Sequence, residues 1–294
     1  MTKGLKATVF AVLAAALYAI NVPLSKLLLE HAAPTMMAAF LYLGAGIGLF
    51  ILGRIQKASG RGASVEPLTK ADLPYTVGMV VLDIIAPILL MLGIERTSSA
   101  NVSLLNNFEI VATSLIALFI FKEVISKRTL LAIVLVTAAS AILSFEGAGS
   151  FEFNTGSLLV LGAATCWGLE NNCTKMISGK SSVQIVTIKG CFSGLGSLVV
   201  AFSVGESLPA IKYIAFILLL GFVAYGLSIN FYIMAQKDLG AAKTSAYYSV
   251  APFLGVGFSM ALLGEAPGAQ FYIALAIMAL STVIMVKDTL STGE

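Results

Sequence analysis

Four charged side chains stand inside long apolar stretches of the sequence. They are Asp83, Glu109, Glu170 and Lys189. A charge at the centre of a membrane helix costs about 2.5–3.5 kcal/mol on insertion-based scales, so such a charge is normally paired or used. A carboxylate there can bind an ammonium group or hold a proton, and a lysine can neutralise it. We therefore expect all four side chains to face the protein interior or a water-filled cavity.

Distance from the nearest turn indicates which charges lie at the same depth. Glu170 and Lys189 lie about equally far from a turn near Gly179, so they can pair, either as an ion bridge that fixes two helices or as part of a binding site. Asp83 and Glu109 flank an earlier turn in the same way, and no lysine is predicted beside them. Two carboxylates at low dielectric favour retention of a shared proton. The alternative is that each is hydrogen-bonded separately to an Asn or Ser.

Amide and aromatic side chains accompany these charges. An amide can bind an amino or carboxyl group, or it can hold two helices together with about 0.6–2 kcal/mol. An aromatic ring can attract an ammonium group, or it can serve only as packing or as an interfacial anchor. With the charges, these residues give the candidate substrate-binding set: Tyr18, Asn21, Asp83, Asn101, Asn106, Glu109, Trp167, Glu170, Asn171, Lys189, Tyr225, Tyr247 and Tyr248.

The elements that must position these residues are apolar runs long enough to cross a bilayer. The 294-residue chain is 58% hydrophobic and 11% charged, with a mean hydropathy of +0.95, whereas soluble domains are about 25% charged. This composition excludes soluble, fibrous and disordered proteins and argues against nucleic-acid binding. A membrane helix needs about 20 apolar residues. Ten runs qualify: 5–29, 34–55, 73–94, 100–121, 129–145, 156–177, 183–204, 213–236, 241–263 and 269–286.

The distribution of basic residues predicts the orientation of these spans. If the N-terminus is cytoplasmic, fourteen of the 18 Lys and Arg residues fall on the inner side, three on the outer side and Lys189 within a span. Cytoplasmic loops carry such an excess. We therefore expect a multi-pass protein of the inner or plasma membrane with both termini in the cytoplasm.

The chain also repeats itself. Residues 16–26 align with 165–175, which places Tyr18 over Trp167 and Asn21 over Glu170, and residues 100–123 align with 242–265 without a gap. The second span of each half carries closely spaced glycines, which let membrane helices approach each other. We expect two five-helix repeats, 1–148 and 149–294. Because five is an odd number, the second repeat must be inverted, an arrangement typical of secondary transporters.

These motifs resemble the ten-helix EamA-type branch of the drug/metabolite transporter superfamily. The aromatic–small pair followed after eight residues by a basic residue is present as Tyr18-Ala19 with Lys26, and as Trp167-Gly168 with Lys175. The family's central Glu-Pro pair in the fourth helix of each half is divided here, as Glu109-Ile110 and Ala251-Pro252. Its basic residue early in the second helix matches Lys189 in one half only. The resemblance implies an all-α integral membrane fold and a metabolite transporter, often an exporter, that does not hydrolyse ATP.

The expected cargo is a small amphiphilic metabolite, with an amino acid or related amine favoured because interior carboxylates outnumber the interior lysine. We expect Glu109 and Asn106 to bind the ammonium group or a proton, while Asp83 shares that charge. The expected wall is Tyr18, Trp167 and Tyr248, with Asn101 and Lys189 placed to meet a carboxylate. Charged residues at span ends are expected to cap helices, snorkel or bridge loops: Lys26, Lys122, Glu123, Lys175 and Glu265.

Other functions stay open at this point. The cargo could belong to another class, such as nucleosides, purines or drug-like cations. A channel, a membrane scaffold or a membrane-embedded lipid-modifying enzyme is a further alternative. The sequence shows no Gly-Lys-Ser phosphate loop and no HExxH motif, and the single His31 and three cysteines form no ligand cluster. We therefore expect no enzyme activity, no cofactor and no metal, and we expect lipid, a small metabolite and protons as partners.

Overall fold

The computed structural model describes residues 3–59, 66–120, 126–144, 154–177, 179–239, 247–248 and 250–292, and these are helical with short connections. The first half contains α1 (Lys3–Ala19), α2 (Asn21–Leu28), α3 (Pro34–Ala58), the 3₁₀ turn η1 (Lys70–Asp72), α4 (Leu73–Arg96), α5 (Ser99–Leu105), α6 (Phe108–Phe119) and α7 (Lys127–Ser144). The second half contains α8 (Thr155–Ile177), α9 (Ser182–Ser203), α10 (Ile211–Gly221), the π-helical turn η2 (Phe222–Leu227), α11 (Ser228–Leu239), α13 (Ala251–Leu263) and α14 (Ala269–Thr292).

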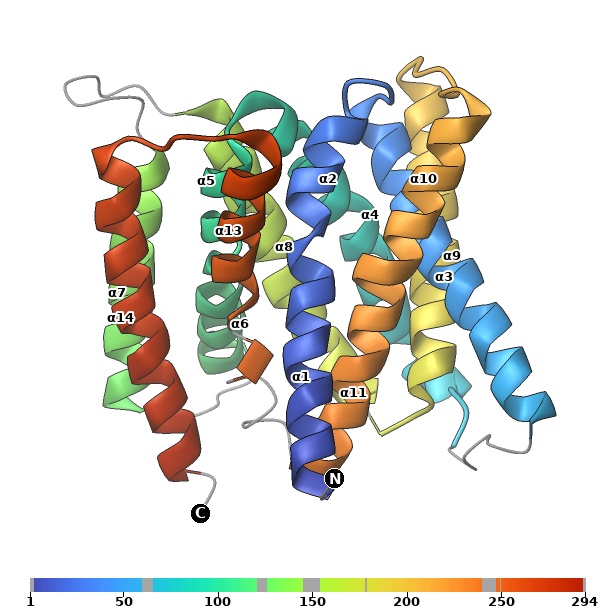
Figure 1. Cartoon of the computed structure of the whole chain (residues 1–294). Coiled ribbons are helices and arrows are strands. Elements are labelled where there is room, and N and C mark those ends of the chain that lie inside the picture. The colour runs from blue at the N-terminus through green and yellow to red at the C-terminus, as the bar shows by residue number, and fades with distance from the viewer. Residues whose placement is uncertain are drawn as a thin grey trace.

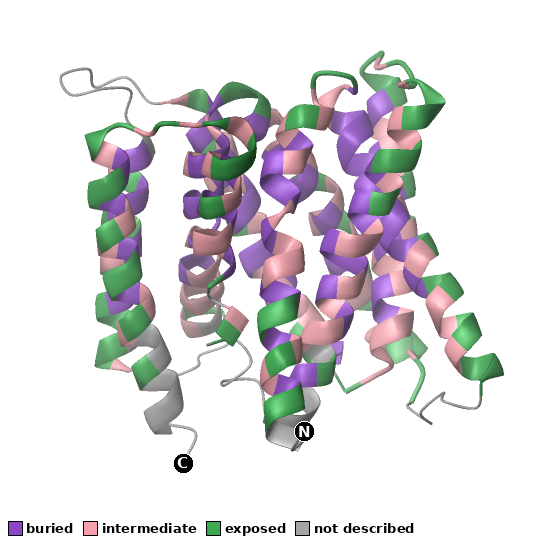
Figure 2. Ribbon diagram, viewed as in Figure 1, coloured by how far each residue is buried: buried purple, intermediate pink, exposed green. Residues whose placement is uncertain are grey.

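These helices form an all-α membrane protein. Within the described residues, five segments are long and apolar enough to cross a bilayer, and three shorter apolar helices accompany them. The helices run roughly alongside one another as a bundle, and α1 begins at the same edge at which α14 ends (Figure 1). Outward faces carry exposed apolar residues while buried positions turn toward neighbouring helices (Figure 2). On α9, for example, Phe192, Leu195, Val199 and Phe202 are exposed at helical spacing, as a surface in contact with lipid requires.

The first predicted span is interrupted near its middle. Helix α1 ends at Ala19 and α2 begins at Asn21. Pro23 explains the interruption, because it has no backbone N–H and its ring clashes with the carbonyl group four residues earlier. The break places Asn21 at the start of a new helix inside the membrane layer.

The fourth predicted span, expected as one run over 100–121, is also interrupted. Between α5 and α6, Asn106 and Asn107 form a turn in which the N–H groups of Glu109 and Ile110 bond three residues back, each at 3.1 Å. Short amide side chains compete for backbone hydrogen bonds and so favour such breaks. Glu109 therefore occupies the first turn of α6. In the second half, α13 begins at Ala251, which the sequence alignment pairs with Glu109.

The packing order of the helices follows the predicted repeat. Helix α4 packs against α8, and its counterpart in the second half, α10–α11, packs against α1. Likewise α6 packs against α8 and α13 against α1, while α3 pairs with α9 and α7 with α14. Exchanging each helix for its counterpart leaves this set of contacts unchanged, as a twofold relation between halves would require. The boundary between residues 148 and 149 lies outside the described residues and stays a prediction.

The glycine-rich second and seventh spans approach each other closely, as the sequence predicts. A Cβ atom added to Gly46 of α3 would lie 2.4 Å from the backbone nitrogen of Cys191 on α9. One added to Gly190 would lie 2.3 Å from the backbone nitrogen of Gly46. The two backbones are therefore in direct contact, and this contact joins the first half of the chain to the second.

Candidate functional site

A buried ion-pair cluster lies where α4, α8 and α9 meet. Lys189 Nζ on α9 is 3.0 Å from Asp83 Oδ2 on α4 and 3.0 Å from Glu170 Oε1 on α8. The side chain of Lys189 is 13% exposed, and those of Asp83 and Glu170 are 0% and 2% exposed. We call these three residues the charge triad. The predicted pairing of Glu170 with Lys189 is confirmed.

The expectation that no lysine lies beside Asp83 is wrong. Lys189 contacts it directly, because α4 packs against both α8 and α9. Depth along neighbouring spans cannot reveal this long-range pairing. The carboxylates that come together are consequently Asp83 and Glu170, bridged by Lys189, rather than Asp83 and Glu109.

Two further donors hold Asp83 in place. The hydroxyl group of Tyr42 donates to Asp83 Oδ1 at 2.9 Å, and Trp167 Nε1 donates to the same oxygen at 3.2 Å. Both oxygens of Asp83 therefore face donors. Tyr42 is not among the residues predicted for the site, although it is the one tyrosine of the 34–55 run and lies near the middle of that run. A tyrosine at mid-span is the signal that could have found it, because a buried hydroxyl group needs a partner.

Glu109 lies apart from the charge triad and has a different kind of partner. Asn171 Nδ2 donates to Glu109 Oε1 at 2.6 Å, across the contact between α8 and α6. Both side chains are only partly buried. Asn172, next along α8, uses its amide to bond the carbonyl oxygens of Thr113 and Gly168 at 3.2 and 2.8 Å. Asn172 thus joins the helices, while Asn171 orients a carboxylate that remains accessible.

A row of tyrosine rings lies beside these carboxylates. The ring of Tyr225, on η2, packs against those of Tyr42 and Tyr18, with centroids 5.3 and 5.8 Å apart. Tyr18 also lies 6.1 Å from Tyr248. Asn21 Nδ2 donates to the Tyr225 hydroxyl group at 3.0 Å, which ties the break in the first span to the π-helical turn. π-Helical turns are frequent at functional sites.

Two predicted site residues, Asn101 and Tyr247, lie outside this arrangement, and Asn106 differs from the prediction in its position along the helix. Asn101, near the start of α5, lines a separate cavity of about 290 Å³ with Phe271 and Leu143. Asn106 is buried in the turn before Glu109, so the two do not share a continuous helix face as expected. Tyr247 is 39% exposed, in contrast to Tyr248 beside it.

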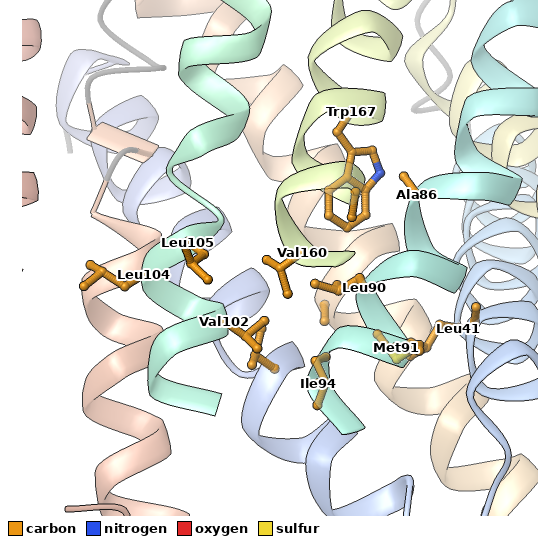
Figure 3. Close-up of a cluster of buried hydrophobic side chains, with 14 of the residues drawn as sticks. Leu41, Ala86, Leu90, Met91, Ile94, Val102, Leu104, Leu105, Val160 and Trp167 are labelled. Atoms are coloured by element: carbon orange, nitrogen blue, oxygen red, sulfur yellow. The ribbon is translucent and has the colours of Figure 1, made fainter. Parts of the chain in front are cut away.

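An apolar layer separates the charge triad from the edge opposite the termini. Figure 3 shows Trp167 at one end of this layer, which continues through Leu90, Ile94, Val102 and Val160. Leu90 and Ile94 lie two and three turns beyond Asp83 on α4. The triad is thus shielded from water on that side, which strengthens its ion pairs.

Charged side chains cap the helix ends at the edge of the molecule opposite the termini, as expected for Lys26 and Glu265. Lys26 Nζ donates to the carbonyl oxygens of Ile94 and Thr97 at the end of α4, the latter at 2.9 Å. Glu265 accepts from the N–H groups of Ser99 and Ala100 at 2.8 and 2.7 Å. These contacts match the partial charges of helix ends. Lys122 and Glu123 lie outside the described residues.

A multi-pass helical bundle with paired charges in its interior and helices interrupted at mid-membrane is the architecture of a membrane transporter. The comparison with known families agrees. The chain belongs to the EamA-like transporter family, whose model matches residues 5–145 and again 154–287. The protein is therefore a multi-pass membrane transporter.

Individual relatives support the same class. A protein of Methanothermobacter thermautotrophicus described as an uncharacterized transporter is 26% identical over 263 residues, which cover 84% of this chain and 76% of that protein. A crystal structure of another protein matches with a TM-score of 0.70 and 16% identity, over 95% of this chain and 94% of its own. At that identity the likeness concerns the fold alone.

Proposed function

We propose that the protein is a secondary active transporter that exports a small amphiphilic metabolite carrying an amino group, an amino acid or a related amine. Glu109 carries this proposal. Among the described residues it is the interior carboxylate without an ion-pair partner, and it stays partly accessible while Asn171 fixes its orientation. A carboxylate in this position can exchange a proton for an ammonium group, whereas the carboxylates of the charge triad are already compensated by Lys189.

In this proposal Glu109 binds the ammonium group or a proton, and the tyrosine row forms the wall of the site. The rings of Tyr225 and Tyr248 pack against the ring of Tyr18, with centroids 5.8 and 6.1 Å apart. Their ring faces attract a cation by about 0.5–2 kcal/mol each. The charge triad holds α4 of the first half to α8 and α9 of the second, and so fixes the two halves around the site.

Alternating access completes the proposal. Two inverted halves would rock about the direct contact between α3 and α9, where glycines leave the backbones free of intervening side chains. The cytoplasmic termini and the plasma or inner membrane follow from the excess of basic residues on one side. The direction, export, is supported by the family that the sequence resembles.

Counterflow in proteoliposomes tests the proposal. Vesicles containing the purified protein are loaded with unlabelled amino acids or amines, and uptake of the labelled compound is followed. A carrier gives saturable exchange, whereas a channel gives flux without exchange. We expect Glu109→Gln to abolish both exchange and its dependence on a pH gradient. Unchanged pH-dependent exchange in Glu109→Gln would remove Glu109 from the mechanism.

The matched control is Glu66→Gln, which also removes one carboxylate charge. Glu66 is 81% exposed, where it pairs with Lys180 at 3.0 Å outside the membrane-spanning segments. This hydrogen bond raises the pKa of Lys180, so the two charges are linked to each other. Because an exposed pair of this kind is worth about 0–1 kcal/mol, Glu66→Gln should transport as the unaltered protein does.

A further inference from the structure

The geometry points to a cargo that is an amine without a free carboxylate, rather than a zwitterionic amino acid. This inference narrows the proposed function and rests on it. It follows from asking which interior groups remain able to bind a carboxylate and which remain able to bind an ammonium group.

A cargo carboxylate would need a cation, and the interior cation is already used. Lys189 lies 3.0 Å from two carboxylates, so its charge is already shared between two acidic side chains before any cargo arrives. Releasing Lys189 to a cargo carboxylate would leave Asp83 or Glu170 buried without compensation, which is strongly unfavourable. Lys26 offers no substitute, because its ammonium group bonds the carbonyl oxygens at the end of α4.

Four neutral donors near the carboxylates are used as well. Trp167 Nε1 and the Tyr42 hydroxyl group donate to Asp83. The amides of Asn171 and Asn21 donate to Glu109 and to the Tyr225 hydroxyl group. A cargo carboxylate would therefore compete with protein acceptors for every one of these donors.

Asn106 Oδ1 and the Glu109 carboxylate are acceptors whose hydrogen-bonding capacity the described residues do not fill. Asn106, 7% exposed in the turn before Glu109, has an Oδ1 atom that receives no hydrogen bond from the described residues. Glu109 Oε1 accepts from Asn171, and its carboxylate is not paired with a cation. An ammonium group has three N–H donors and a positive charge, so these groups complement it and repel a carboxylate.

The tyrosine row also favours an amine over a compound that carries a carboxylate. The rings of Tyr225 and Tyr248 pack against the ring of Tyr18 with centroids 5.8 and 6.1 Å apart, and aromatic faces attract a cation rather than an anion. A tyrosine hydroxyl group can donate one hydrogen bond but supplies no positive charge. An amino acid would therefore bring a second, uncompensated carboxylate into an already acidic interior.

The test uses sets of compounds that differ only at the carboxylate. Tyrosine is compared with tyramine and with tyrosine methyl ester, and lysine with cadaverine and lysine methyl ester. Each is offered for counterflow to vesicles containing the full-length protein, with protein-free vesicles correcting for passive leakage. The methyl esters are slightly larger than the amino acids but lack their negative charge, so an ester that exchanges shows that charge rather than size excludes the amino acid.

We expect at least one amine and its matched ester to exchange about a hundredfold faster than the parent amino acid, the factor that one uncompensated charge in a membrane interior produces. Glu109→Gln should lose the exchange of both, while Glu66→Gln should retain it. Thermal unfolding of each purified variant checks that lost exchange does not reflect loss of the fold.

Three other outcomes overturn the inference in distinguishable ways. If an amino acid exchanges as fast as its amine, the protein does not select amines over amino acids, but the proposed function stands. Exchange of the amine but not of the ester shows that size, not charge, excludes the amino acid. Absence of exchange by every amine, ester and amino acid overturns the proposed function and this inference together.

Discussion

The interior carboxylates differ in how their charge is compensated, and this difference separates structural residues from the proposed binding residue. Asp83 and Glu170 share one lysine and are inaccessible to solvent. Glu109 is oriented by an amide and stays partly accessible. An ion pair holds helices together at the expense of binding capacity, whereas an amide leaves the charge of a carboxylate available. All three positions carry an acidic residue, so the sequence alone does not separate them. Only the packing of the helices shows which carboxylates are paired with the lysine and which one is accessible.

Removing the lysine of the charge triad should destabilise the protein. Lys189→Met leaves two buried carboxylates without a cation, and stranding one partner of a buried ion pair costs about 3–5 kcal/mol. Thermal unfolding in detergent should show this as a lower midpoint. Neutralising both acids in the same chain, with Asp83→Asn and Glu170→Gln, should recover most of the loss.

The control for this substitution is Lys180→Met, which removes a lysine from the exposed pair with Glu66. That pair is worth about 0–1 kcal/mol, so the midpoint should hardly move. Equal midpoints for Lys189→Met and the unaltered protein would show that the triad contributes nothing to stability.

At the scale of elements, the helices could be predicted and their interruptions could not. Apolar runs of the right length gave the spans, and the close approach of α3 and α9 was visible in their glycines. Pro23 marks the first break, yet Pro87 leaves α4 continuous from Leu73 to Arg96. A proline alone therefore does not determine whether a membrane helix is interrupted, because neighbouring groups also decide how the freed backbone is accommodated. Such neighbours cannot be read from local sequence.

The contact between α3 and α9 gives a prediction at this scale. Gly46→Ala would place its Cβ atom 2.4 Å from a backbone nitrogen of α9, which forces the helices apart. Overpacking of this kind costs about 1–3 kcal/mol. We expect a lower unfolding midpoint together with slower exchange, because the two halves meet at this point.

Gly257→Ala is the matched control on α13. A Cβ atom there would meet nothing within 4 Å. Alanine favours a helix over glycine by about 0.8–1 kcal/mol, so this variant should be as stable as the unaltered protein or slightly more stable. If both variants behave alike, the contact between α3 and α9 is looser than the backbone distances require.

At the scale of the whole molecule, the sequence was informative about the order of the helices but not about which distant residues meet. The repeat and the family resemblance gave the architecture. Tyr42, Asp83 and Lys189 come from three helices, and their contacts depend on crossings between the two halves of the chain. Periodicity within one span cannot determine such crossings. The apolar layer from Trp167 to Ile94 depends in the same way on how α4 and α8 pack.

The orientation of the whole molecule provides the last prediction. Helix α3 ends at the edge at which α1 begins, whereas the connection between α9 and α10 lies at the opposite edge (Figure 1). Ser59 and Ser207 are exposed residues at these two edges. In a variant lacking Cys166, Cys173 and Cys191, each serine is replaced in turn by cysteine and intact cells are treated with a membrane-impermeant maleimide.

Ser207→Cys should be labelled in intact cells, and Ser59→Cys should be labelled only after the membrane is opened. The physical reason is the excess of Lys and Arg at the edge that contains Ser59, because basic loops are retained on the cytoplasmic side during insertion. The opposite labelling pattern would show that the orientation is inverted and that the capped helix ends at Lys26 and Glu265 lie on the cytoplasmic side. Labelling of both positions in intact cells would contradict the placement of the two edges on opposite sides of one membrane, and with it the transport path between them.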